Sequence, residues 1–259
     1  MTAARIRSAL LPVILPVVLF AAWWILSAGS TQAYFPPLSR IVEAFFGYFT
    51  GESLQTDVLP SVLRLVTGYL LATVIGIAVG VVIGTNAVLR AMFEPVLEFI
   101  RAVPPPALVP LILLLAGIGD TSKVLIIAFG SVWPIMLNTV EGVRSVDEVL
   151  DDNSRVFGIT GMQRTRSLVL RSASPQIVTG MRQSLSVAIV LMVVSEMFAA
   201  QSGIGYQVIA AQRTFAITQM WGGVLLLSLI GVLASLVFAV FERSSLTWYH
   251  GQRLSERNS

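Results

Sequence analysis

The chain has 259 residues, of which 55% are hydrophobic and 12% are charged, and its mean hydropathy is +0.81. This composition excludes an ordinary soluble protein and predicts one helical membrane domain over residues 1–259, because little polar sequence is left for a soluble domain. The net charge is +3, but the basic residues are scattered over loop ends, so we expect no nucleic acid partner. The chain contains no cysteine, which excludes disulfides and thiolate metal sites.

Six apolar segments approach the length that a helix needs to cross a bilayer, about 20 residues with roughly 17 as a lower limit. They are residues 10–26, 65–88, 102–118, 124–140, 183–200 and 220–241. The first is similar to a signal peptide, but its apolar run exceeds the roughly 7 to 15 residues of a signal core, and we interpret it as an uncleaved span. Segment 34–50 is apolar with few charges, which predicts an interfacial helix. The sequence therefore predicts an all-α polytopic membrane protein with about six transmembrane helices.

Glycines recur at four-residue spacing in the second span. Gly76, Gly80 and Gly84 form the pattern GIAVGVVIG, and Gly68 lies in line with them. Small residues at this spacing create a groove that another helix can approach closely. We predict a packing seam here, rather than glycines that the membrane helix merely tolerates.

Prolines concentrate in the third span and continue in the fourth. Proline removes a backbone donor and kinks or interrupts a helix, and broken backbone at membrane depth must be buried in protein or line a cavity. We therefore predict that these two spans border a pathway; the alternative is a packing kink without a cavity. The residues concerned are Pro104, Pro105, Pro106 and Pro110 in the third span, and Pro134 and Asn138 in the fourth.

A polar loop separates the fourth and fifth spans. Ser145 with Glu148, and Thr160 with Gln163, fit capping boxes, so the loop predicts two short helices broken at Gly158. Apolar residues at helical spacing give the first of these helices an apolar face, which predicts a docking element for a soluble partner. The alternative is an amphipathic loop that rests on the membrane surface. The apolar residues are Val146, Val149, Leu150, Val156 and Phe157.

Glu196 lies in the sequence VVSEMFAA, near the end of the fifth span. A carboxylate is costly there unless it faces water, a partner helix or the pathway. We predict a polar contact that fixes or gates this helix. Direct substrate binding is the alternative, and an acid would repel an anionic solute.

The remaining ionisable residues offer no catalytic site. The only histidine is His250, so a serine–histidine intramembrane protease or a histidine-ligated metal site has no candidate base or ligand set within the spans. The only lysine, Lys123, lies outside any glycine-rich nucleotide loop. We therefore expect no enzyme activity, no metal and no cofactor in this chain.

Charge asymmetry predicts the orientation. With six spans both termini lie on one side, and of the 17 lysines and arginines only Arg40, Arg64, Lys123 and Arg213 fall in segments on the other side. Because cytoplasmic segments carry the excess of basic residues, we expect cytoplasmic termini and a cytoplasmic loop over about 144–175. Arg64 and Arg213 would then be outward-facing cations that attract an anion or anchor the chain at the interface.

The loop resembles the signature of binding-protein-dependent ABC importer permeases: a glutamate and two alanines, a glycine four residues later, then an aliphatic-x-Leu-Pro stretch. The departures are aspartate for glutamate, Asn-Ser for the alanine pair, and Arg171 where the first proline is usual. The stretches IRAVPPPALVPLILLLAGIGDTSK and SEMFAAQSGIGYQVIAAQRTF look like the nitrate, sulfonate and taurine branch of these permeases. The matching loop positions are Asp152, Asn153 and Ser154 for the first three, Gly158 for the glycine, Leu168 and Leu170 for the aliphatic residues, and Pro175 for a downstream proline.

This resemblance implies a permease subunit of an ATP-driven importer in the bacterial plasma (inner) membrane. The partners would be a cytoplasmic ABC ATPase subunit that hydrolyses the ATP, an external solute-binding protein, a second copy of this chain, and the lipid bilayer. The branch carries small anions, sulfonates and thiamine-type pyrimidine precursors, which favours a sulfonate, nitrate or similar small anion here. The loop would couple to the ATPase through Asp151, Asp152, Asn153, Ser154, Arg155, Phe157, Gly158, Leu170 and Pro175.

Two other classes of function remain open. A secondary transporter would need paired membrane-embedded acids or discontinuous helices in two matching halves, whereas Glu196 is solitary and no internal repeat is visible. A non-transporting membrane scaffold would need only the docking loop, and it would show no solute flux with all partners present.

Overall fold

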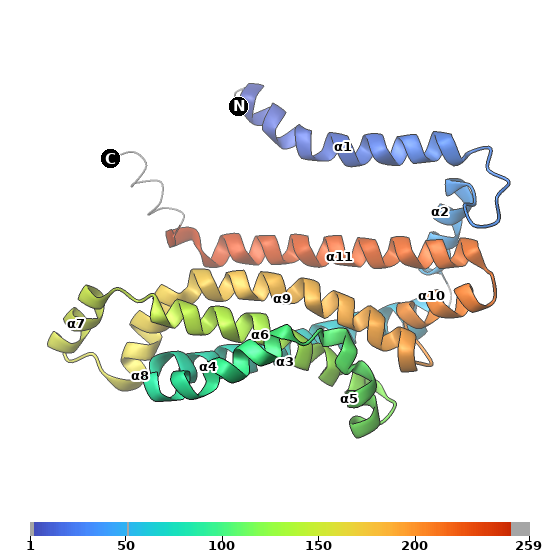
Figure 1. Cartoon of the computed structure of the whole chain (residues 1–259). Helices are drawn as coiled ribbons and strands as arrows, with labels where there is room; N and C mark the ends of the chain where they lie inside the picture. The colour runs from blue at the N-terminus through green and yellow to red at the C-terminus, as the bar shows by residue number, and fades with distance from the viewer. Residues whose placement is uncertain (1–2, 51, 250–259) are drawn as a thin grey trace.

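The computed structural model describes residues 3–50 and 52–249, and every regular element in these ranges is helical. The termini beyond these ranges, with His250, lie outside the described residues. Long helices α3, α6, α9 and α11 form an elongated bundle (Figure 1). In chain order the elements are α1 (Ala3–Ser27), α2 (Leu38–Gly47), η1 (Leu54–Val58), α3 (Leu59–Thr85), α4 (Ala87–Ala102), η2 (Pro105–Leu108), α5 (Val109–Ala116), α6 (Asp120–Arg144), α7 (Glu148–Val156), α8 (Gly161–Arg164), η3 (Thr165–Val169), α9 (Leu170–Ala199), α10 (Ile204–Arg213) and α11 (Ile217–Ser245).

The all-α polytopic architecture is confirmed. Within the described part, four helical stretches are long and apolar enough to cross a membrane: Leu54–Thr85, Asp120–Arg144, Gly161–Phe198 and Ile217–Ser245. The bent pair Ala87–Ile100 and Pro105–Ala116 would make a fifth, and Ile14–Ser27 is a shorter apolar helix in the place of the first predicted span.

The predicted third span is interrupted at its prolines, as the sequence indicated, and a separate helix, α4, precedes the break. α4 ends at Ala102, and the chain bends by 88° between Ala87–Ile100 and Pro105–Ala116. The cause is the run Pro104–Pro106, because three successive residues without N–H groups cannot extend the hydrogen-bond ladder of α4. Pro110 causes no further break, since the second residue of α5 needs no intrahelical donor. Pro134 lies inside α6.

The glycine stripe of α3 lies directly against α6. Gly68, Gly76, Gly80 and Gly84 are all buried. A Cβ added at Gly80 would lie 2.6 Å from the Thr139 Cβ and 2.9 Å from the Met136 carbonyl oxygen. Because α6 also packs along α9, it forms the centre of the bundle.

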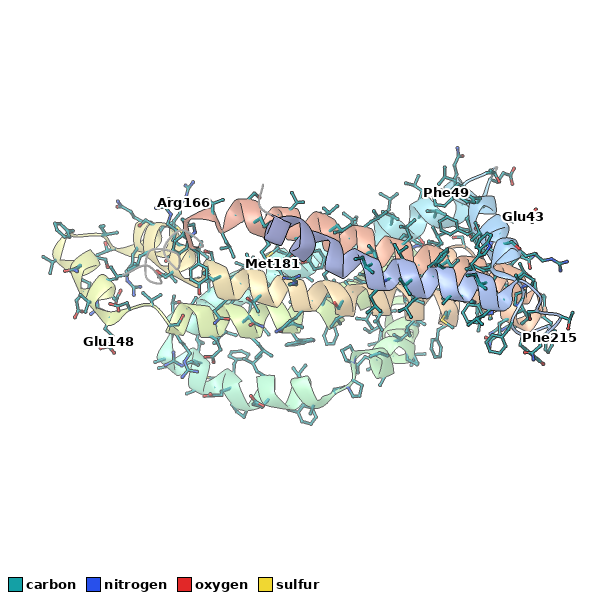
Figure 2. All side chains as sticks on the ribbon, turned by 90° about the horizontal axis from the view of Figure 1, so that it is seen from above. Glu43, Phe49, Glu148, Arg166, Met181 and Phe215 are labelled. Atoms are coloured by element: carbon teal, nitrogen blue, oxygen red, sulfur yellow. The ribbon has the colours of Figure 1, made fainter. Side chains whose placement is uncertain are left out.

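The bundle has two structurally different ends. The loop end carries α7 and α8, and the opposite end carries α2 and α10 (Figures 1 and 2). α2 accounts for most of the predicted interfacial helix, but it also packs against α11, where a Cβ at Gly222 would lie 3.0 Å from the Phe45 backbone nitrogen. The buried Leu38 and Ile41 form the inner face of α2.

Candidate functional site

The boundaries of α7 come from one aspartate and one glycine. The Asp147 Oδ1 accepts hydrogen bonds from the backbone N–H of Val149 (2.8 Å) and of Leu150 (3.1 Å), which caps the start of the helix. At the other end Gly158 adopts φ +70°, the left-handed conformation that stops a helix at little cost for glycine. The loop therefore presents a rigid helix of two and a half turns rather than a flexible segment.

The predicted cap at Ser145 is wrong. Its backbone N–H donates to the Glu141 carbonyl and its hydroxyl donates to the Gly142 carbonyl at 3.0 Å, so this residue closes α6 and is not free to start α7. Thr160 does precede α8, but its side chain makes no capping hydrogen bond there.

The surface of α7 exposes its apolar side chains. Phe157 is 79% exposed and Val156 is 81% exposed, and Met162 of α8 adds a further exposed side chain beside the break. Among the predicted coupling residues, Asp152, Asn153 and Arg155 are exposed too, while the Ser154 hydroxyl is turned inward onto the Asp151 carbonyl. Within the described chain, nothing buries this apolar face.

Asp151 joins α7 to α8. Its Oδ1 accepts a hydrogen bond from the Arg164 Nε at 2.6 Å and is also paired with the Arg164 Nη2, and its Oδ2 accepts from Arg155 at 3.0 Å. The hydrogen bond from Arg164 holds the pKa of the Asp151 carboxyl below its usual value. Beyond α8, Leu170 begins α9 and contacts the buried cluster of Val143 and Val169, and Pro175 lies inside α9, so the loop is fastened to the bundle.

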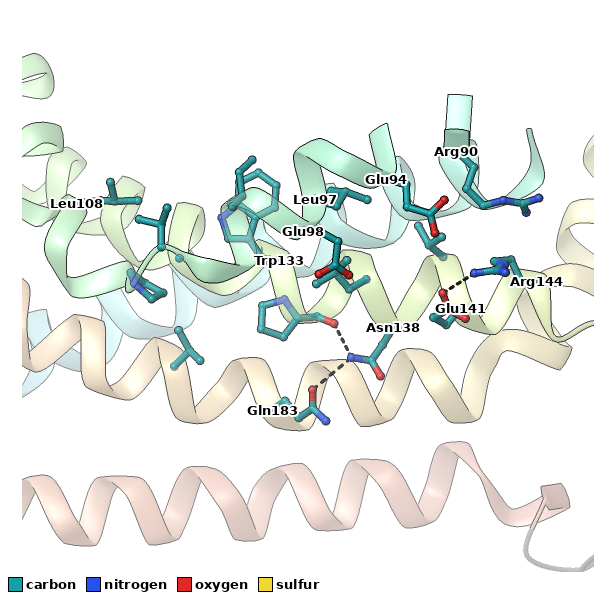
Figure 3. A pocket seen from close by; sticks show the side chains of 18 residues that line it. Arg90, Glu94, Leu97, Glu98, Leu108, Trp133, Asn138, Glu141, Arg144 and Gln183 are labelled. Carbon is teal, nitrogen blue, oxygen red and sulfur yellow. Dashed lines mark hydrogen bonds and ion pairs between the residues drawn. The ribbon is translucent and has the colours of Figure 1, made fainter. Parts of the chain in front are cut away.

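A cavity of about 410 Å³ lies between α4, η2, α6 and α9. Three of the predicted pathway residues, Pro105, Pro134 and Asn138, line it, whereas Pro104, Pro106, Pro110 and Glu196 do not. The Asn138 Nδ2 donates to the Pro134 carbonyl (2.8 Å) and to the Gln183 Oε1 (3.2 Å), as Figure 3 shows. The proline-rich segments therefore border a cavity.

The charged wall of this cavity was missed by the sequence reasoning. Arg90, Glu94 and Glu98 recur every four residues on α4 and face Glu141 and Arg144 of α6 (Figure 3). Their spacing, on a helix whose other face carries exposed apolar side chains, was the signal that could have identified them.

Glu196 lies far from the cavity, in a buried polar cluster at the opposite end. We define the Arg64 cluster as the buried Asp57, Ser61, Arg64 and Glu196, together with Asp120, whose side chain is exposed. Glu196 is fully buried, and its carboxylate accepts from the Arg64 Nη1 (2.7 Å), from the Ser61 hydroxyl (2.7 Å) and from the Gly205 backbone N–H (2.9 Å).

Arg64 is not the outward-facing cation that the sequence suggested. Arg64 is only 4% exposed. Its charge can be buried because Nη1 pairs with the Glu196 Oε1 and Nη2 pairs with the Asp120 Oδ1, each at 2.7 Å. The signal for this arrangement was the spacing of Asp57, Ser61 and Arg64, which recur on one helical face at the start of an apolar span.

A family model described as "Binding-protein-dependent transport system inner membrane component" matches residues 72–245. The chain belongs to this family. A relative from Bacillus subtilis, the aliphatic sulfonates transport permease protein SsuC, is 30% identical over 91% of this chain and 86% of its own. The taurine transport system permease protein TauC of Escherichia coli is 28% identical, covering 91% of this chain and 88% of its own.

The fold also matches a solved transporter structure. A chain of the MetNI methionine ABC transporter, crystallised in inward facing conformations, superposes with a TM-score of 0.61 at 21% identity, covering 73% of this permease and 94% of that chain. The family match and the relatives, together with the apolar helices, make this chain a multi-pass membrane permease of the ABC importer class.

Proposed function

We propose that this permease forms the translocation pathway for a small sulfonate, nitrate or similar small anion. An external solute-binding protein delivers the solute, and a cytoplasmic ABC ATPase, which hydrolyses the ATP, drives the transport. Membership of the permease family and the named relatives support this proposal. The observation that carries it is the exposed apolar face of the capped helix α7.

The charges on α7 favour a protein partner over the membrane surface. Asp147, Glu148, Asp151 and Asp152 are balanced by only Arg155 on the same helix. Helices that lie in a membrane interface are instead rich in lysine and arginine, because the cytoplasmic leaflet is anionic. An acidic rim around exposed Val149, Leu150, Val156 and Phe157 suits a cleft in a soluble subunit with complementary basic groups.

The orientation in this proposal follows from the basic residues. Their excess on the side of the termini puts α7 and both termini in the cytoplasm of a bacterial plasma (inner) membrane protein. Arg144, which lines the cavity beside α4 and ends α6 next to the loop, then lies on the cytoplasmic side, and the Arg64 cluster lies toward the outside.

The pathway in this proposal is completed by a second copy of the chain. The α4–α5 break leaves irregular backbone within a candidate span, and such backbone must be covered by protein or line a cavity. α5, which follows this break, has an exposed apolar side that can pack against the second copy; its residues are Leu111, Leu114 and Leu115.

The charges that line the cavity bear on the solute. Arg90 and Arg144 share the wall with Glu94, Glu98 and Glu141, and Arg144 is paired with Glu141 at 2.8 Å. A wall of mixed sign provides no dedicated anion site, so selection of the solute falls to the external binding protein. Relatives named for the transport of aliphatic sulfonates and of taurine support an anionic sulfonate group in the solute.

A pull-down tests the proposal. The detergent-solubilised full chain is recovered from its native cell, and co-purifying proteins are identified by mass spectrometry, for the unaltered chain and for Gly158→Val. We expect an ATPase with a nucleotide-binding loop, and we expect less of it with Gly158→Val, since valine costs about 1–2 kcal/mol in the left-handed conformation.

The matched control is Gly29→Val, at an exposed glycine with open space around it and no positive φ. It should recover as much ATPase as the unaltered chain. Recovery of no ATPase by the unaltered chain, under conditions that preserve other membrane complexes, would refute the importer function in favour of a secondary transporter or a scaffold.

A further inference from the structure

The turn between α9 and α10 is held by side chains from outside it. Three consecutive backbone N–H groups donate to such side chains: Gly203 to the Asp57 Oδ1 (2.9 Å), Ile204 to the Ser61 Oγ (3.0 Å) and Gly205 to the Glu196 Oε2 (2.9 Å). These are the first donors of α10, which have no intrahelical partner and favour negative charge. The turn is therefore bonded to η1, α3 and α9 together.

Arg64 fixes the same turn through its guanidinium. Its Nη1 donates to the Ser202 carbonyl (3.0 Å) as well as to Glu196, and its Nη2 donates to the Ser202 hydroxyl (3.1 Å). The Nε donates to the Asp120 Oδ1 at 2.9 Å, which adds α6. The guanidinium directs its donors to α6, α9 and the turn from three separate nitrogen atoms, an arrangement that a lysine ammonium, with all three donors on one atom, does not reproduce.

The turn is packed closely against Glu196 and the end of α9. A Cβ at Gly203, where φ is +119°, would lie 2.5 Å from the Glu196 Cδ, and a Cβ at Gly205 would lie 2.8 Å from the Val193 carbonyl oxygen. Any displacement of the end of α9 must therefore carry the turn with it.

α9 connects this turn to the loop end. It runs for 30 residues, about 45 Å at 1.5 Å per residue, from Leu170 beside η3 to Ala199 beside the turn. A buried ion pair is a weak source of stability, because desolvation offsets most of its attraction, so stability alone is a poor explanation for Arg64 and Glu196. Their geometry instead fixes one relative position of three elements.

We propose that Arg64 is a positioning residue that makes α9 and the α9–α10 turn one mechanical unit. The turn, with exposed Gln201 and half-buried Ser202, is then the surface on which the external binding protein docks. The displacement that this docking causes is transmitted through α9 to α7 and the ATPase. This inference rests on the proposed function and identifies the turn as the place on the outer side where coupling to the ATPase begins.

The test compares Arg64→Lys with Arg213→Lys, the same change at an exposed arginine on the same end. Each variant is reconstituted in liposomes with the ATPase from the same native cell. ATP hydrolysis is then measured without and with the solute-loaded binding protein from that cell. For Arg64→Lys we expect stimulation by the binding protein to fall at least about fivefold, the lower end for coupled sites, with basal hydrolysis unchanged. Arg213→Lys should retain both activities.

A double variant protects this test against simple misfolding. Arg64→Met with Glu196→Gln removes both charges of the buried Arg64–Glu196 pair, a replacement that proteins often tolerate, and glutamine still accepts from the Gly205 N–H. We expect an unfolding temperature near that of the unaltered chain, with stimulation lost.

Full stimulation in either variant would overturn the positioning role of Arg64. A parallel loss of unfolding temperature and of basal hydrolysis in the double variant would also overturn it, in favour of a purely structural role. An unaltered importer that shows no stimulation would overturn the importer function itself.

Discussion

The close contact between α3 and α6 predicts that one added methyl group will destabilise the protein. In Gly80→Ala the new Cβ would lie 2.6 Å from the Thr139 Cβ, about 0.8 Å short of ordinary van der Waals contact at 3.4 Å. Neither neighbour can rotate away, because the Thr139 Cβ and the Met136 carbonyl oxygen are fixed to the backbone of α6. The two helices must therefore separate.

The magnitude follows from two opposing effects. Overpacking of this kind costs about 1–3 kcal/mol, since a gap of about 0.5–1 Å along the seam forfeits a quarter to a half of each dispersion contact. Alanine in a helix recovers roughly 0.5–1 kcal/mol relative to glycine. The net expectation is a loss of about 1 kcal/mol in the free energy of unfolding, with an upper limit of about 2.5 kcal/mol.

Gly231→Ala is the matched control, because a Cβ at that position of α11 meets no atom within 4 Å. It should be neutral or slightly stabilising. The assay is unfolding in mixed detergent micelles by sodium dodecyl sulfate, followed by the fluorescence of the five tryptophans. Equal midpoints for Gly80→Ala and Gly231→Ala would refute the packing argument.

Three further predictions concern the loop. Phe157→Asp should abolish recovery of the ATPase in the pull-down yet leave the free energy of unfolding within about 0.5 kcal/mol, because the ring is 79% exposed; unchanged recovery would contradict the docking role of α7. Asp147→Ala should cost about 1 kcal/mol in local stability, seen as faster hydrogen exchange of α7 amides, whereas Ser145→Ala should leave that exchange unchanged. The lowered pKa of Asp151 means that its pairing with Arg164 stabilises the loop above the unfolded pKa of about 3.9 and is lost as pH falls below it. Exchange of α7, corrected for intrinsic rates, should therefore rise in the native chain as the pH is lowered below that unfolded value, and a similar rise in Asp151→Asn would refute this cause.

Features that depend on neighbours in sequence were predictable. The stripe of Gly76, Gly80 and Gly84 indicated a close helix contact, and the structure lays α6 along it. The prolines at 104–106 indicated an interruption, and Gly158 indicated the end of the first loop helix. Each of these depends on the steric properties of one residue type, which act within a turn or two of the chain.

The cap of α7 shows where local reasoning reaches its limit. Ser145 and Asp147 both precede the helix, and both are good capping residues. The choice between them depends on where α6 ends, and α6 extends to Arg144 because its C-terminal residues Gly142 and Val143 pack in the bundle. Packing of one helix thus decides the first residue of the next.

The Arg64 cluster was beyond the reach of such patterns. Arg64 and Glu196 are 132 residues apart in the chain, and the order of spans alone does not say which faces meet. The only sequence signal was the cost of each group, since a buried arginine and a buried carboxylate must each find a partner. Two such residues near the same end of different spans, Arg64 and Glu196, could have been paired on that ground. The third partner, Asp120, has a side chain that is 72% exposed, so its role could be found only from the position of the Arg64 guanidinium.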